Sequence, residues 1–194
     1  HEWGAMGRIL TITGPSGAGK SRITKALLEE EGFSIITSIT TRPKRPTDLE
    51  GEYLYLQPEK FDELEKRGSF LWVAKLRSCS YGTLKRSIDS ALEMPQGIKI
   101  MILVPEILRI LCDRLQGKNL ISLFIKTSPK KIRERLMRAG LKEDEIKQRL
   151  NDQRNWEKEM KASGVPYHAV SNDGDLPETL QNVYLILATN PPTN

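Results

Sequence analysis

The segment at residues 14–21 constrains this chain more than any other feature. Its sequence, GPSGAGKS, fits the pattern G-x-x-x-x-G-K-[ST] of a phosphate-binding loop (P-loop). Residues 8–13 before it are apolar and β-branched, as in a buried strand, and residues 21–30 after it place apolar side chains on one face of a helix. A strand, a glycine-rich loop and a helix in this order predict a polyphosphate site, with backbone N–H groups and the helix N-terminus facing the ligand.

The loop predicts a role for each of its polar side chains. We expect Lys20 to reach the β- and γ-phosphates of ATP, and the Ser21 hydroxyl to bind Mg²⁺. The expected ATP-binding residues are Gly14, Pro15, Ser16, Gly17, Ala18, Gly19, Lys20 and Ser21. A glycine-rich turn without a ligand is the alternative, and the complete motif in the correct context disfavours it.

Composition narrows the kind of protein. The 194 residues suit one domain, and no apolar run approaches the roughly 18 residues of a transmembrane helix, so we expect no membrane partner. Cys79 and Cys112 are isolated, which favours a reducing, cytoplasmic location. The net charge of +5 indicates an anionic partner. Because the basic residues are dispersed and no nucleic-acid motif is present, we expect a small phosphorylated ligand and no nucleic acid.

Strand and helix patterns alternate along the chain, which predicts an α/β fold with a mainly parallel sheet flanked by helices. The expected strands after the first lie at residues 33–36, 53–56, 70–74, 99–104, 120–125 and 168–170. The expected helices after the first lie at residues 58–66, 83–93, 105–115, 129–137, 142–161 and 176–188. Residues 37–51 are predicted to be an irregular polar segment, and the highly charged residues 142–161 a solvent-facing helix or a mobile lid.

Two arginines follow the second expected strand. Arg42 and Arg45 lie three residues apart beside β-branched residues, and such a pair can bind a phosphate through bidentate guanidinium contacts. Their position after a P-loop suits the phosphate of an acceptor that faces ATP.

With these residues in place, the chain resembles guanylate kinases. The resemblance rests on the P-loop, the segment at residues 38–46, Tyr53, Tyr55, the segment at residues 68–74, residues 81–83, Arg135, Arg138, Arg149 and residues 171–173. It covers nearly all of residues 8–188. The resemblance implies an α/β core of the P-loop NTPase type with a small acceptor-binding lobe and a helical lid.

The resemblance also suggests boundaries within the chain. We expect residues 1–7 to be a remnant of recombinant expression and residues 8–190 to form a single guanylate-kinase-like domain. Its core comprises residues 8–37, 84–137 and 162–190, its acceptor-binding lobe residues 38–83, and its lid residues 138–161.

The function implied by the resemblance is ATP-dependent phosphoryl transfer to the phosphate of a nucleoside monophosphate, with GMP or dGMP as the default. The implied catalytic residues are Lys20, Arg42, Arg138 and Arg149, and Asn172 is placed near the adenine. The implied acceptor-binding residues are Ser38, Arg42, Arg45, Tyr53, Trp72, Tyr81 and Thr83. ATP and Mg²⁺ are the implied cofactors, with Ser21 as the metal ligand.

The chain departs from the family pattern at two places. Guanylate kinases carry a guanine-binding glutamate where this chain has Trp72, and the indole has one N–H donor and no acceptor. The family's acidic segment in the central strand is also absent, since residues 103–106 read LVPE and only Glu106 is acidic. Trp72 either fills the core or stacks on the acceptor, and Asp48 or Glu50 is a candidate replacement for the missing guanine acceptor.

These departures leave two alternatives open. One is a kinase of another phosphorylated small molecule, such as ribose 1,5-bisphosphate, whose kinases share the P-loop and lack the central acids. The other is a non-catalytic guanylate-kinase-like binding module, which the intact P-loop disfavours. The oligomeric state is not determined by the sequence.

Overall fold

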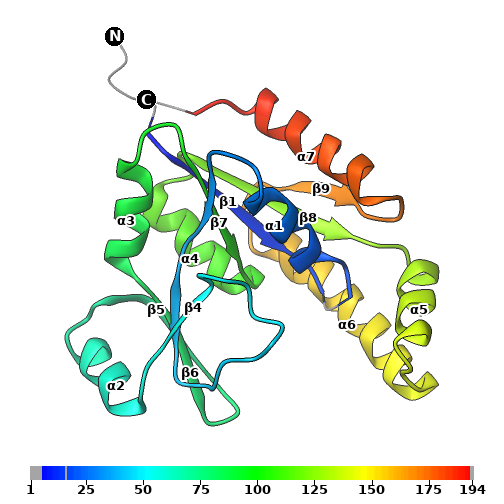
Figure 1. Ribbon diagram of the computed structural model, residues 1–194, viewed down its shortest axis with the longest axis horizontal. Helices are drawn as coiled ribbons and strands as arrows, with labels where there is room; N and C mark the ends of the chain where they lie inside the picture. The colour runs from blue at the N-terminus through cyan, green and yellow to red at the C-terminus, as the bar shows by residue number, and fades with distance from the viewer. Residues whose placement is uncertain (1–5, 16, 193–194) are drawn as a thin grey trace.

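The computed structural model describes residues 6–15 and 17–192 of the chain. It has an α/β fold in which a five-stranded parallel sheet lies between two groups of helices, with a smaller sheet beside it (Figure 1). The strands are β1 (Arg8–Thr13), β2 (Phe33–Ile35), β3 (Ser38–Thr40), β4 (Tyr53–Tyr55), β5 (Phe70–Leu76), β6 (Cys79–Leu84), β7 (Ile98–Ile102), β8 (Leu120–Lys126) and β9 (His168–Ser171). The helices are α1 (Lys20–Leu28), α2 (Pro58–Lys66), α3 (Lys85–Glu93), α4 (Pro105–Leu115), α5 (Pro129–Arg138), α6 (Glu143–Ala162) and α7 (Leu176–Thr189).

The large sheet confirms the predicted fold class. Its strand order is β2-β7-β1-β8-β9, and every neighbouring pair is parallel. Because β1 is central, its residues are buried on both faces, which accounts for its run of apolar and β-branched side chains. The carboxyl ends of parallel strands meet at one edge, so the segment after β1 lies at the edge where ligands bind in open α/β sheets.

Each face of the large sheet packs against its own helices. On one face, Ile23 and Leu27 of α1 and Val183 of α7 pack against the alternating residues Leu10 and Ile12 of β1. On the other face, Ile88 of α3, Leu108 of α4 and Met160 of α6 pack in the cluster that contains Ile9. Successive side chains of a strand point to opposite faces of the sheet, and side chains of a helix share one face about every 3.6 residues. The sheet is therefore covered by apolar helix faces on both sides.

The smaller sheet has the order β4-β3-β6-β5 and its own apolar cluster. In this cluster Phe61 of α2 stacks on Phe70 of β5, with ring centroids 4.6 Å apart, and both pack with Ile39 of β3. The smaller sheet and α2 are therefore stabilised by an apolar core of their own, separate from that of the large sheet.

Two strands of the smaller sheet are absent from the sequence prediction. Residues 38–40 form β3 instead of irregular chain, and residues 83–84 end strand β6 instead of starting a helix, which begins at Lys85. Strand β3 has only three residues, too few for a visible alternation, and it is held by pairing with both β4 and β6. These two segments form strands because they pair with strands that are distant in the sequence, and local propensity alone does not predict them.

Of the expected remnant at residues 1–7, residues 1–5 lie outside the described residues. No helix within residues 6–15 and 17–192 combines the length and the hydropathy that crossing a membrane requires.

Candidate nucleotide and acceptor site

The P-loop connects the carboxyl end of β1 to the start of α1, as predicted (Figure 1). Gly17 and Gly19 have φ angles of 87° and 97°, in the left-handed region that favours glycine. Gly19 is also in close contact with the side chain of Asn172, where a Cβ atom would collide with the amide nitrogen. The glycines therefore allow both the turn and the packing of the loop. Ser16 lies outside the described residues.

Lys20 is the first residue of α1, and its side chain folds back over the loop. Its ammonium group donates hydrogen bonds to the carbonyl oxygens of Gly14 and Pro15, the latter at 2.9 Å. The same Nζ atom lies 5.4 Å from the centroid of the Trp156 ring in α6. Burial lowers the pKa of Lys20 to about 8. The side chain thus lies beside the loop, and its contact with the phosphates of ATP stays a prediction.

A cleft of about 660 Å³ opens at this loop. It is lined by Gly17, Gly19, Lys20, Ser21, Arg22, Arg135, Trp156 and Asn172. Trp156 and Arg22 had no predicted role, and Arg135 was noted only as part of the resemblance. The Arg135 guanidinium donates to the backbone oxygen of Asn172 at 2.8 Å, which holds a cation at the cleft wall.

Asn172 supports the loop from behind. Its side-chain nitrogen donates to the Ala18 carbonyl oxygen at 2.7 Å, and its side-chain oxygen accepts from the Thr179 hydroxyl at 2.9 Å. Asn172 is buried and lines the cleft, but both ends of its amide are used within the protein. Its contact with adenine stays a prediction.

Three predicted charged residues do not line this cleft. Arg138 is exposed in the last turn of α5, one turn beyond Arg135, and Arg149 lies in α6. Glu106 is exposed in the first turn of α4 and lines a different cleft, together with Arg109 of α4 and Glu159 of α6. Among the described residues, the arginine at the P-loop cleft from the 135–149 region is Arg135.

A second, larger cleft of about 940 Å³ adjoins the first. Ser21 and Arg22 line both clefts, and residues 46–50 of the smaller sheet's connecting loop form the opposite wall of the second. The two clefts therefore run from the P-loop to the segment that follows Arg42 and Arg45.

Three of the four predicted phosphate-binding residues come together, while the side chain of the fourth, Arg45, is exposed. The Arg42 guanidinium carbon lies 4.9 Å from the ring centroid of Tyr53 and 6.0 Å from that of Tyr81. The two tyrosine rings are 6.2 Å apart. Burial raises the pKa of Tyr53 to about 12, so its hydroxyl remains a hydrogen-bond donor at neutral pH.

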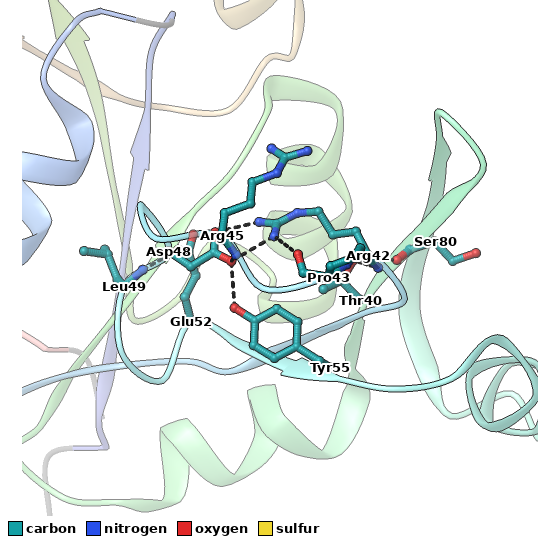
Figure 2. Close-up of polar contacts among 9 residues, drawn as sticks. All are labelled: Thr40, Arg42, Pro43, Arg45, Asp48, Leu49, Glu52, Tyr55 and Ser80. Atoms are coloured by element: carbon teal, nitrogen blue, oxygen red, sulfur yellow. Dashed lines mark hydrogen bonds and ion pairs between the residues drawn. The ribbon is translucent and has the colours of Figure 1, made fainter.

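Arg42 forms an ion pair with Asp48, which the sequence analysis considered as an acceptor for guanine. Its two terminal nitrogens donate to the Asp48 side chain at 2.8 Å and 2.7 Å (Figure 2). Hydrogen bonding to Arg42 is the main cause that holds the pKa of Asp48 far below its usual range. The candidate role of Asp48 as a free acceptor for guanine is therefore wrong, because its oxygens are already engaged.

The remaining predicted acceptor residues lie on neighbouring strands. The hydroxyls of Ser38 and Thr83 are hydrogen-bonded to each other at 2.7 Å, and Thr83 pairs with Trp72 in the β5–β6 register. Trp72 is half-buried and packs against the core cluster of the large sheet that contains Leu103. Ser38, Thr83 and Trp72 thus form a wall where the two sheets meet.

Comparison with known proteins identifies the family of this chain. A sequence model of the family described as guanylate kinase matches residues 6–190. The chain belongs to the guanylate kinase family. It is 36% identical over 152 residues to a guanylate kinase of Mycoplasma genitalium, covering 75% of this chain and 62% of that protein. It is 30% identical over 185 residues to a guanylate kinase of Rickettsia bellii, covering 93% of each chain.

The fold of the guanylate kinase family is also found by structural comparison. The crystal structure of guanylate kinase from Anaplasma phagocytophilum superposes with a TM-score of 0.70, covering 97% of this chain and 89% of that one. At 21% identity this likeness concerns the fold. The aligned segments cover between about three fifths and nine tenths of the two relatives named above.

Proposed function

We propose that this chain transfers the γ-phosphoryl group of ATP to the phosphate of GMP or dGMP. The observation that carries the proposal is the shared wall of the two clefts. Ser21 and Arg22 line both clefts, and the second cleft extends from there to residues 46–50, the loop that follows Arg42 and Arg45. Phosphoryl transfer needs two anions aligned among cationic donors and little covalent chemistry.

The side chains divide between the two substrates. Lys20 and Arg135 supply positive charge on the donor side, where negative charge moves during transfer. Arg42, Arg45, Tyr53 and Tyr81 bind the acceptor phosphate. Ser38 and Thr83 offer hydroxyls to the rest of the acceptor.

The lid and the acceptor-binding lobe complete the proposed site. Arg138 and Arg149 belong to the segment at residues 138–161 that we propose as a lid, and they approach the ATP phosphates only if that segment moves. Residues 38–83 act as the acceptor-binding lobe. Both assignments follow from the family resemblance and from the separate apolar cluster of the smaller sheet.

Mg²⁺ is expected to enter with the nucleotide. The Ser21 hydroxyl is exposed at the start of α1 and lines the cleft, so it fits the oxygen ligand that the motif requires. Within residues 6–15 and 17–192, no group of three or more His, Cys, Asp or Glu residues is arranged to hold a metal ion. The other ligands would therefore be phosphate oxygens and water, and the bound ion would neutralise phosphate charge.

The test is a coupled ADP-release assay with ATP and Mg²⁺. GMP, dGMP, AMP, UMP and CMP are compared as acceptors, and turnover is expected with GMP and dGMP. Absence of turnover with every nucleotide, while ATP still binds by calorimetry, would refute the proposal.

Trp72 supports one second candidate, a kinase of another phosphorylated small molecule. The indole presents no acceptor to a guanine base, and its packing against the core uses part of the ring. Ribose 1,5-bisphosphate in the same assay tests this candidate. A larger kcat/KM with the sugar phosphate than with GMP would favour it. A binding module without catalysis is the outcome if neither acceptor is phosphorylated and ATP–Mg²⁺ does not bind.

A further inference from the structure

The carboxylate of Asp48 is saturated by donors from its own loop. Besides the two Arg42 nitrogens, it accepts from the Arg45 backbone N–H at 2.9 Å and from the Tyr55 hydroxyl at 2.7 Å. Figure 2 shows these groups converging on one carboxylate. The side chains of Arg42 and Asp48 are 7% and 6% exposed, so the ion pair is shielded from solvent.

The backbone ties Asp48 in place as well. Its own N–H donates to the Arg45 carbonyl oxygen at 3.0 Å, so residues 45 and 48 are linked in both directions. A phosphate that displaced this carboxylate from Arg42 would also have to open the turn, and it would leave a buried charge unpaired. Asp48 is therefore a permanent partner of Arg42, and it is not a substitute that the acceptor phosphate replaces.

The pairing leaves specific donors for a ligand. The Nε atom of Arg42 is buried and has no hydrogen-bond partner in the part of the chain that the structure describes. Arg45 contributes its backbone N–H to Asp48, while its exposed side chain runs away from the carboxylate (Figure 2). One guanidinium edge of Arg42 and the whole guanidinium of Arg45 thus remain for an oxyanion.

We propose that Asp48 is the positioning residue of the acceptor-phosphate site. Its carboxylate holds the Arg42 guanidinium over the rings of Tyr53 and Tyr81 and fixes the turn that carries Arg45. Both arginines are then preorganised for the acceptor phosphate, so less side-chain entropy is lost when the phosphate binds. This inference rests on the proposed function, because the phosphate it concerns belongs to the proposed acceptor.

The test is the Asp48→Asn variant, which keeps the shape of the side chain and removes its charge. We expect the Kd and KM for GMP to rise about tenfold or more, as for a buried charge pair that loses one partner. The KM for ATP should stay within about twofold of wild type, because the P-loop belongs to another part of the molecule. Asp48→Glu, which keeps the charge, should recover part of the GMP affinity.

A matched control removes an exposed aspartate of the same kind. Asp113 is paired with Arg109 at 3.1 Å within α4, and its side chain is 64% exposed. Asp113→Asn should leave the Kd and KM for GMP unchanged. In the Arg45→Ala/Asp48→Asn double variant, the loss of GMP affinity should be smaller than the sum of the two single losses, because both act on one phosphate contact.

Several results would overturn the inference. An unchanged or tighter Kd for GMP in Asp48→Asn would mean that the carboxylate competes with the phosphate. A parallel loss of ATP binding, or a Glu variant that restores the Tm without GMP affinity, would mean that Asp48 only stabilises the fold. Wild-type protein that binds GMP without phosphorylating it would refute the proposed function alone. Wild-type protein that neither binds nor phosphorylates GMP would refute both.

Discussion

The ammonium group of Lys20 lies 5.4 Å from the ring centroid of Trp156, so a P-loop side chain contacts the long charged helix α6. This distance is within the range of a cation–π interaction. The contact joins the start of α1 to a helix far along the chain. It places the proposed lid helix at the wall of the nucleotide cleft, next to the group that is expected to bind phosphate.

Lys20→Ala should abolish turnover and leave the fold intact. Its charge is directed at the loop, where it would stabilise the moving phosphoryl group, and we expect kcat to fall by about 100-fold or more. Steady-state kinetics and a thermal melt check the two parts of this prediction. Lys130→Ala, an exposed position on α5, is the control and should change neither. A kcat near the wild-type value in Lys20→Ala would contradict the assignment.

ATP binding should take up protons above neutral pH. Burial lowers the pKa of Lys20 to about 8, so the amine is increasingly neutral as the pH rises above that value. Phosphate charge beside it favours the protonated form and raises the pKa, so the complex holds more protons than the free protein in this window. As the pH falls below the lowered pKa, Lys20 is increasingly charged in the free protein, and its contribution to the uptake fades.

Calorimetry in two buffers of different ionisation enthalpy measures this uptake. At about pH 8.5 we expect a fraction of a proton per ATP bound, and at about pH 7 a smaller contribution from Lys20. Lys20→Arg is the control, because a guanidinium stays charged throughout. Equal uptake in wild type and Lys20→Arg at the higher pH would contradict the prediction.

Asn172→Ala should weaken the P-loop. The substitution removes two buried hydrogen bonds, to the Ala18 carbonyl and from the Thr179 hydroxyl. Each of these two groups keeps one longer hydrogen bond, with Thr127 and Asp175 respectively. We expect a loss of about 1–2 kcal/mol in the free energy of unfolding, at about 1 kcal/mol for each lost bond. Denaturant unfolding measures the loss, and a higher KM for ATP should accompany it. Asn151→Ala, at an exposed position of α6, should lose neither stability nor ATP affinity.

Trp72→Glu should raise kcat/KM for GMP if the wall formed with Ser38 and Thr83 keeps its shape. A carboxylate accepts from the N–H groups of guanine, and recovering a matched polar contact can be worth about tenfold or more. Trp72→Leu separates this effect from simple opening of the site, because leucine adds space and no acceptor. A similar gain in both variants would attribute the effect to space, and no gain in either would mean that this wall does not contact the base.

The P-loop and the elements that flank it could be predicted well from the sequence. The motif at residues 14–21 is contiguous, and its glycines and flanking periodicities determine the strand, the turn and the helix locally. The structure accordingly has β1, the positive φ angles of Gly17 and Gly19, and α1 in the predicted order. The parallel sheet follows from alternating strands and helices in the same way.

The sequence by itself thus determined the fold class and the P-loop, and the family resemblance implied the grouping of Arg42 with the tyrosines. Only the tertiary structure decided that Asp48 pairs with Arg42, that Arg135 lines the nucleotide cleft and that Trp156 meets Lys20. Strands β3 and β6 were also decided at this level, by pairing with each other and with β4 and β5. The physical reason is that backbone conformation is set by nearby residues. A contact between side chains depends instead on how loops, strands and helices fold against one another, and this holds even for Arg42 and Asp48, which are six residues apart.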